Sequence, residues 1–349
     1  MSVVLIGDRP VGDGAPVYII AEAGSNHDRD LDQARRLVDA AAAAGADAVK
    51  FQTFTAERIV AETKTRARYL DAILPPDETM AALFRKLELP YEWHGTLKEH
   101  AEAAGLDFLS SAFDEGAVDL LHGLRVKAFK VATYELWHLP LIRYIARLGR
   151  PMICSTGMAS IGEVEQAVRA VEQEGNLGNL VLLHCTVNYP PPFAELNLRA
   201  MATMRTAFGV PVGYSDHTPG WTAPVVATAL GAAVIEKHFT TSRDRPGPDH
   251  RFALEPPELG AMIRAIRDAE ASLGDGVKRM APAEADLYVT ARRSLHAARD
   301  IEAGQVLDRD AIAILRPGTG IEVRDLDHVV GRVARRRIER HEPLAWEMF

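Results

Sequence analysis

Polar and ionisable side chains recur at the same end of eight short apolar segments of the 349-residue chain, and amphipathic helical stretches separate these segments. The side chains at the segment ends are Glu22; Lys50 and Gln52; Ser110 and Ser111; Lys130, Thr133 and Glu135; Ser155 and Thr156; His184 and Thr186; Ser215, Asp216 and His217; and Glu236, Lys237 and His238. A lone serine or lysine more often makes an ordinary structural hydrogen bond. Recurrence in all eight segments predicts a catalytic mouth.

Two of these side chains, Lys50 and Lys130, indicate a pocket for a phosphate-bearing anion. Hydroxyl groups end the third, fourth, fifth and seventh segments, and ammonium and hydroxyl groups are the donors that a phosphate needs. The alternative is a Schiff-base aldolase, in which one lysine is the nucleophile. The presence of a second lysine favours the anion pocket over the aldolase, because the positive charge of that lysine would help to bind a dianion.

His217 and His238 indicate a site for a divalent metal ion. They take matching places on two segments expected to be adjacent, so their side chains would converge from about 5 Å. Two imidazoles with carboxylates nearby and an open coordination position suit an exchangeable Mn²⁺ or a Mg²⁺-like Lewis acid. The alternative is a pair of histidines that only form hydrogen bonds.

The elements that must position these groups are eight β–α repeats, which predict a (β/α)₈ TIM barrel over residues 1–274. The repeats fill roughly 270 residues, the usual size of such a barrel. A doubly wound sheet is disfavoured because no glycine-rich phosphate turn follows the first strand. The predicted strands are Val17–Gly24, Ala46–Phe54, Asp107–Phe113, Ala128–Thr133, Pro151–Thr156, Leu180–Thr186, Pro211–Thr218 and Ala233–Thr240.

Helix signals between the strands support the same fold. Ser160 and Glu163 form a capping box ahead of a helical repeat, and the last helix is expected to end at Gly274. The connection from Thr55 to Glu92 contains Pro75-Pro76 and far exceeds an ordinary loop, so we expect it to shape the active site.

The remaining residues predict a polar linker, 275–290, and a small β-rich domain, 291–349. Such a domain lies near the lower size limit for independent stability, so we expect it to pack on something larger. An ice-binding role is the weakest reading, because its 11 arginines and 10 acidic residues suit a flat apolar surface poorly.

Composition narrows the class of protein. Hydrophobic residues make up 47% and charged residues 25%, as in ordinary globular proteins. The net charge of −8 without a long basic run argues against nucleic-acid and membrane partners. Cys154 and Cys185 lie in apolar runs, and no targeting or membrane-spanning segment is evident, so we expect a cytoplasmic protein with reduced thiols.

Several motifs, in order and spacing, resemble the sialic acid synthase family, which includes legionaminic and pseudaminic acid synthases and spore coat polysaccharide enzymes. The motifs are IIAEAGSNHD, GADAVKFQTF, SSAFD, KVATYE, STGM, HCTVNYPPP, GYSDHTPG, EKHFT and GPDH. RRSLHAARDIEAGQVL and LRPGTGI resemble the SAF domain, which is similar to type III antifreeze protein. The resemblance covers nearly the whole chain.

The resemblance implies a transferase for surface polysaccharide biosynthesis. It would condense phosphoenolpyruvate with the open-chain aldehyde of an N-acylated hexosamine, giving a nonulosonic acid and phosphate. Glu22 would lie nearest the water that adds at carbon 2, although Glu135 could take that role. Arg316 would reach the sugar in a neighbouring subunit of a domain-swapped homodimer. The other implied contacts are Lys50, Ser111, Lys130, Thr133, Ser155 and Ser215 to phosphoenolpyruvate; His217 and His238 to the metal; and Gln52, Glu135, Tyr189 and Asp249 to the sugar.

Departures from the family pattern cluster near the acceptor. Ala112 replaces a common proline, Thr133-Tyr134 stands where Ser-Gly is usual, and Val187 is apolar. The pattern suggests the same reaction on N-acetylmannosamine or on a modified hexosamine, such as a 6-deoxy diacetamido sugar. A non-catalytic barrel that binds a glycan or a partner is the alternative of another class.

Overall fold

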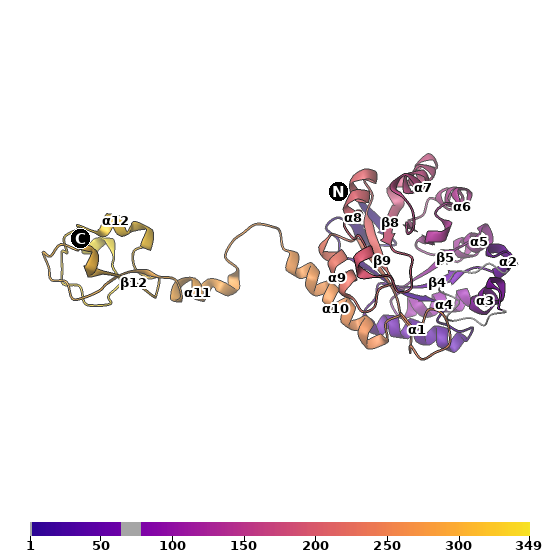
Figure 1. Ribbon diagram of the computed structural model, residues 1–349, viewed down its shortest axis with the longest axis horizontal. Coiled ribbons are helices and arrows are strands. Elements are labelled where there is room, and N and C mark those ends of the chain that lie inside the picture. Colours follow the sequence, from indigo (N-terminus) through magenta and orange to yellow (C-terminus); the bar gives the residue numbers. More distant parts are fainter. Residues whose placement is uncertain (1, 64–77) are drawn as a thin grey trace. The chain divides into compact units, whose positions relative to one another are not determined.

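Eight parallel strands close a barrel in the order β10-β3-β4-β5-β6-β7-β8-β9 (Figure 1). The computed structural model describes residues 2–63 and 78–349. The strands are β3 (Tyr18–Gly24), β4 (Ala48–Thr53), β5 (Asp107–Ala112), β6 (Phe129–Val131), β7 (Met152–Ser155), β8 (Leu180–Cys185), β9 (Val212–Asp216) and β10 (Val234–His238). The predicted TIM barrel is confirmed, and each predicted strand contains the observed one.

Helices cover the outside of the barrel. They are α1 (Leu31–Ala44), α4 (Trp93–Ala103), α5 (Glu115–Gly123), α6 (Leu139–Ala146), α7 (Ile161–Gln173), α8 (Ala200–Phe208), α9 (Thr222–Ala229) and α10 (Pro256–Leu273). The predicted capping box begins α7, because Ser160 Oγ accepts a bond from the Glu163 amide and the Glu163 carboxylate accepts one from the Ser160 amide. α10 ends before Gly274, as predicted.

The core has two layers, because successive strand residues alternate between the helices and the barrel interior. Inward side chains such as Ile20, Leu109 and Val181 form one buried cluster with Val4 and Ile6. The latter two come from a hairpin of β1 (Val3–Ile6) and β2 (Arg9–Gly12) that the sequence analysis did not predict. The hairpin therefore packs against the interior residues of the barrel.

The long connection after β4 contains two short helices, α2 (Ala56–Ile59) and α3 (Met80–Leu87). Its Pro75-Pro76 pair lies outside the described residues. Within the described ranges, no helix combines the length and the apolar character needed to cross a membrane.

Residues 275–349 form a second compact unit, separate from residues 1–274. The predicted linker contains a 3₁₀ turn (Pro282–Glu284) and α11 (Ala285–Thr290). The antiparallel pair β11 (Ser294–Ala297) and β12 (Ile312–Leu315) and the short helix α12 (Leu326–Val329) follow. Buried Leu295, Leu307, Ile338 and Leu344 belong to a core of the unit's own.

Candidate active site

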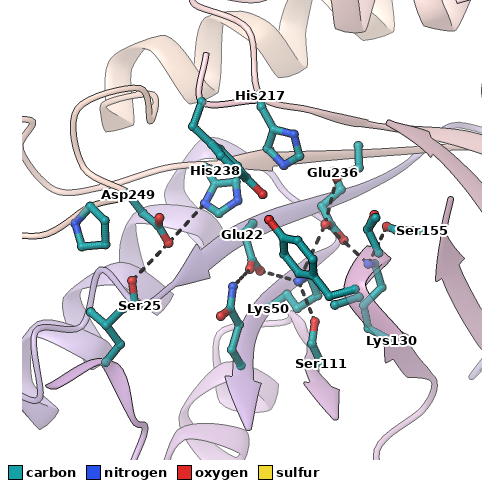
Figure 2. A pocket seen from close by; sticks show the side chains of 18 of the residues that line it. Glu22, Ser25, Lys50, Ser111, Lys130, Ser155, His217, Glu236, His238 and Asp249 are labelled. Atoms are coloured by element: carbon teal, nitrogen blue, oxygen red, sulfur yellow. Dashed lines mark hydrogen bonds and ion pairs between the residues drawn. The ribbon is translucent and has the colours of Figure 1, made fainter. Parts of the chain in front are cut away.

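A cavity opens at the C-terminal ends of the strands, and every barrel strand or the residue just after it contributes to its lining. The predicted site residues that line it are Glu22, Lys50, Gln52, Ser111, Lys130, Thr133, Ser155, Tyr189, Ser215, His217, His238 and Asp249. Figure 2 shows ten of the cavity's side chains with their labels, Glu22 and the two lysines among them. The predicted mouth is therefore where the sequence pattern placed it.

Two lysines and two carboxylates, all almost fully buried, meet inside the cavity (Figure 2). Lys50 Nζ lies 2.8 Å from Glu22 Oε2 and 3.7 Å from Glu236 Oε1, and it donates to Ser111 Oγ at 3.1 Å. Lys130 Nζ lies 3.8 Å from Glu236 Oε1 and donates to Ser155 Oγ at 2.8 Å. The ammonium groups of both lysines thus stand beside hydroxyl groups, as an anion site requires.

Burial and mutual charge set the ionisation of these groups. Burial raises the pKa of Glu22 to about 7, although Lys50 opposes the rise. Burial also favours neutral Glu236, but Lys130 and Lys50 outweigh it and hold the pKa of Glu236 below its ordinary value. For Lys50, the two carboxylates outweigh burial and raise the pKa, whereas burial lowers the pKa of Lys130. One carboxylate is therefore held ionised, and the other titrates near neutrality.

His217 and His238 stand side by side on the β9 and β10 side of the cavity, with ring centroids 5.4 Å apart. Burial lowers the pKa of both imidazoles, so both are neutral at pH 7. The Nδ1 atom of His217 lies 3.0 Å from the Thr186 carbonyl oxygen, which assigns the proton to Nδ1 and leaves Nε2 with a lone pair. His238 Nδ1 is buried without a hydrogen-bond partner among the residues that the structure describes, and Asp249 Oδ2 lies 4.0 Å away.

This donor set fits a weakly held divalent cation. Neutral imidazole nitrogens are good ligands for transition metals. Over the described ranges, no group of three or more His, Cys, Asp and Glu side chains could by itself hold a metal ion. A cation held here would have the two imidazoles as its protein ligands and would need further ligands that the described residues do not supply.

Apolar side chains form another part of the cavity wall. Phe54, Phe113 and three residues of α3, namely Leu83, Phe84 and Leu87, line it. The Phe54 ring lies 5.6 Å from Phe84 and 5.4 Å from Phe113, measured between centroids. The long connection after β4 thus shapes the cavity, as expected from the sequence, although its apolar character was not predicted.

A second aromatic group surrounds the histidines. The Tyr189 ring lies 4.6 Å from His217, and the Phe252 ring lies 5.1 Å from His238. Tyr134 also lines the cavity, and its side chain is hydrogen-bonded to Tyr189. Tyr134, which stands at the position where glycine is usual in the family pattern, therefore forms part of the cavity wall.

Two predicted site residues do not join the cavity. Glu135 lies on a 3₁₀ turn, Thr133–Glu135, and is absent from the lining; burial raises the pKa of its carboxyl to about 8. Arg316 belongs to the second unit, where its side chain is exposed. Glu236, by contrast, lies between the two lysines but was given no role in the sequence analysis. Its place two residues before His238 was the available signal, because such residues share a strand face.

Comparison with known proteins gives one consistent result. Residues 37–278 match the NeuB family, and residues 292–349 match the SAF domain. The N,N'-diacetyllegionaminic acid synthase of Legionella pneumophila is 41% identical over 98% of this chain and 97% of its own length. The crystal structure of spore coat polysaccharide biosynthesis protein SpsE from Bacillus subtilis superposes with a TM-score of 0.69 at 39% identity, over 99% of both chains. N-acetylneuraminic acid synthetase from Leptospira borgpetersenii, in complex with citrate, gives a TM-score of 0.73 at 32% identity over 82% of this chain and 95% of its own.

Proposed function

Because the chain belongs to the NeuB family and carries a C-terminal SAF domain, we propose that it synthesises a nonulosonic acid from phosphoenolpyruvate and an N-acylated hexosamine. The names of its legionaminic acid, pseudaminic acid and N-acetylneuraminate-9-phosphate synthase relatives support this class of product. The observation that carries the proposal is the pair of buried lysines with hydroxyl partners, 3.1 and 2.8 Å away, in the cavity that also holds two neutral histidines.

Phosphoenolpyruvate would bind to Lys50 and Lys130, with hydroxyl donors from Ser111, Thr133, Ser155 and Ser215. Its phosphate and carboxylate would replace part of the lysines' contact with Glu22 and Glu236. Charge-assisted hydrogen bonds of this kind are stronger than neutral ones, especially where water is excluded. The cavity would thereby orient carbon 3 of the substrate toward an acceptor bound near the histidines.

The reaction forms one carbon–carbon bond and, through the addition of water, one carbon–oxygen bond, and it breaks the carbon–oxygen bond to phosphate. Carbon 3 of phosphoenolpyruvate attacks the aldehyde carbon of the open-chain sugar, and the aldehyde oxygen takes a proton. Water adds at carbon 2, and Glu22 accepts the water's proton; a pKa of about 7 suits this transfer near neutrality. The tetrahedral intermediate then loses phosphate and a hydroxyl proton to give the 2-keto acid.

His217 and His238 would hold Mn²⁺ or Mg²⁺, which supplies Lewis-acid polarisation of the aldehyde oxygen. In that arrangement the His217 Nδ1–H bond to the Thr186 carbonyl fixes the ring orientation. Gln52 and Asp249, which contact Glu22 and Ser25 at 3.0 and 3.1 Å, lie where they can bind acceptor hydroxyls.

N-acetylmannosamine is the reference acceptor, and a 6-deoxy diacetamido hexose is the second candidate. The apolar wall of Phe54, Phe84 and Leu87 favours the latter, because methyl groups fit such a surface and an extra hydroxyl would lose hydrogen bonds there. The name of the Legionella pneumophila relative agrees with this candidate.

The second unit would complete the site in a domain-swapped homodimer. Its core is small, and its exposed Arg316 offers guanidinium N–H groups that could donate hydrogen bonds to a sugar hydroxyl or amide oxygen. Arg316 would reach the acceptor bound to the other subunit.

Phosphate release from phosphoenolpyruvate tests the proposal. The assay uses Mn²⁺ and compares N-acetylmannosamine with a panel of 6-deoxy diacetamido hexoses, before and after chelation. Acceptor-dependent release that chelation abolishes and Mn²⁺ restores is the expected result. Release with no acceptor in the panel, despite bound metal, would contradict the proposal and favour the glycan-binding or partner-binding barrel. Trapping of a substrate on lysine by borohydride would favour the aldolase.

A further inference from the structure

The residues beside the two cavity histidines point away from the cavity. Asp216 precedes His217 and Lys237 precedes His238, and neither Asp216 nor Lys237 lines the cavity. Their side chains are 0% and 1% exposed. They lie on the helix side of β9 and β10, because Tyr214 and Ile235, two residues before them, belong to the outer core layer.

A dense set of bonds joins this pair to the segment that carries His217. Lys237 Nζ lies 2.5 Å from Asp216 Oδ2 and also donates to the Thr218 carbonyl oxygen. Asp216 Oδ1 accepts from the Tyr214 hydroxyl and from the Thr218 amide, each at 3.0 Å. Asp216 Oδ2 accepts a third bond from the Thr218 hydroxyl at 3.0 Å. Both residues that flank His217 are thus bonded to the residue that precedes His238.

Stability alone does not account for this arrangement. Removing two charges from water is costly, and apolar residues of similar size often serve a core as well as a buried ion pair does. A buried pair does, however, permit few geometries, because each misplacement leaves a charge without its partner. Here the geometry that it fixes is the relative position of two backbone segments, each ending in a cavity histidine.

We propose that Asp216 and Lys237 are positioning residues that set the spacing of His217 and His238 for a divalent cation. The proposal rests on the metal site of the proposed function. Ligand side chains must be held within roughly 0.5 Å of their productive places by the residues that support them. The Asp216–Lys237 pair supplies that support from behind the strands, where it meets neither the cation nor the substrate.

Binding of Mn²⁺ to the substrate-free protein, followed by the electron paramagnetic resonance of free Mn²⁺, tests the proposal without an activity readout. Lys237→Met and Asp216→Asn each keep the approximate size of the side chain and remove its charge. We expect each to weaken Mn²⁺ binding by roughly 10–100-fold, as supporting residues do at other metal sites. The control is Lys127→Met, which removes an ion pair of 2.5 Å between a partly exposed lysine and buried Asp107 at the opposite ends of the strands. The control should lose stability without a change in Mn²⁺ affinity.

The double variant Asp216→Asn/Lys237→Met separates positioning from stability. Because it removes both charges together, its free energy of unfolding should recover relative to either single variant, and it carries the test if the single variants fail to fold. Positioning predicts that its Mn²⁺ affinity stays low. Affinity that recovers with stability, or single variants that bind Mn²⁺ like the wild type, would overturn the proposal. A wild-type protein that binds no Mn²⁺ would overturn the proposal together with the metal site. A wild-type protein that binds Mn²⁺ but releases no phosphate with any acceptor would contradict the proposed function and leave the positioning role supported by the Mn²⁺ data.

Discussion

Replacing Glu22 by glutamine should make the protein more stable at about pH 8 than at about pH 5, relative to the wild type, while removing most of its activity. Burial raises the pKa of Glu22 to about 7 from its ordinary 4.5, against the opposing charge of Lys50. The folded protein therefore retains a proton that the unfolded chain releases above pH 4.5, so this group lowers stability as the pH rises from 4.5 to about 7. A pKa difference of 7 − 4.5 = 2.5 corresponds to about 3 kcal/mol. Glutamine cannot ionise, so the variant avoids that loss.

Urea unfolding of wild type and Glu22→Gln, at about pH 5 and about pH 8, measures the effect as a difference of differences. The variant should gain about 3 kcal/mol relative to wild type between the two conditions. In the phosphate-release assay, kcat should fall roughly 10²–10⁴-fold, the usual contribution of a positioned proton acceptor. A relative stability that does not change with pH would refute the electrostatic reasoning, and an unchanged kcat would refute the catalytic role.

Glu135→Gln is the matched comparison. Burial raises the pKa of Glu135 to about 8, but the residue does not line the cavity. It should therefore show a pH-dependent gain in stability at least as large as that of Glu22→Gln, because its pKa lies further above 4.5, without the loss of kcat. A large loss of kcat in Glu135→Gln, with Glu22→Gln active, would move the proton-accepting role to Glu135.

Three further predictions concern the substrates. Lys50→Met should abolish phosphate release and cost about 3–5 kcal/mol of stability, because it leaves buried Glu236 with only Lys130 as a counter-charge. Urea unfolding measures the loss of stability, and the phosphate assay measures the loss of activity. A stable, active variant would contradict both expectations. Phe84→Ala should lower kcat/KM for a 6-deoxy diacetamido hexose roughly 10–200-fold more than for N-acetylmannosamine, the range that apolar contacts provide, and an equal loss for both sugars would argue against an apolar acceptor wall. Arg316→Ala should raise the acceptor KM and leave that of phosphoenolpyruvate unchanged; an unaffected acceptor KM would remove Arg316 from the site.

The barrel and most of the cavity could be predicted because both follow from strand periodicity. Parallel strands that are buried on both faces stand out as apolar runs, and their polar ends mark one rim. Strand periodicity says less about Glu135, which does not line the cavity. The sequence analysis ended the predicted strand at Thr133 and listed Glu135 among the polar groups at its end, whereas strand β6 ends at Val131 and a 3₁₀ turn, Thr133–Glu135, follows. A 3₁₀ helix turns by a third of a turn per residue, so Thr133 and Glu135 point in different directions, and of these two residues only Thr133 lines the cavity.

Other features depend on tertiary contacts that leave little trace in the sequence. The β1–β2 hairpin consists of two four-residue strands, and only its packing into the barrel interior shows its role. The apolar wall on α3 is equally hidden, because Leu83, Phe84 and Leu87 follow the pattern of any amphipathic helix. The path of the connection between β4 and α4 decides which helix face lines the cavity, and helical periodicity in the sequence does not predict that path.

Polar side chains lie on both faces of the strands at the barrel mouth, one set in the cavity and the other beneath the helices. At β4 and β5, cavity residues Gln52 and Ser111 stand beside Thr53 and Ser110, whose side chains bond to each other at 2.7 Å behind the strands. Thr53 Oγ1 also lies 2.7 Å from His94 Nε2 of helix α4. The Asp216–Lys237 pair repeats this pattern at β9 and β10 with charged groups. Polar residues on the helix side of the strands thus add cross-strand bonds behind the cavity to those that the cavity groups make among themselves. Substitutions on the helix side of the barrel mouth should therefore disturb ligand binding in proportion to the cross-strand bonds that they remove, even where the cavity keeps every side chain.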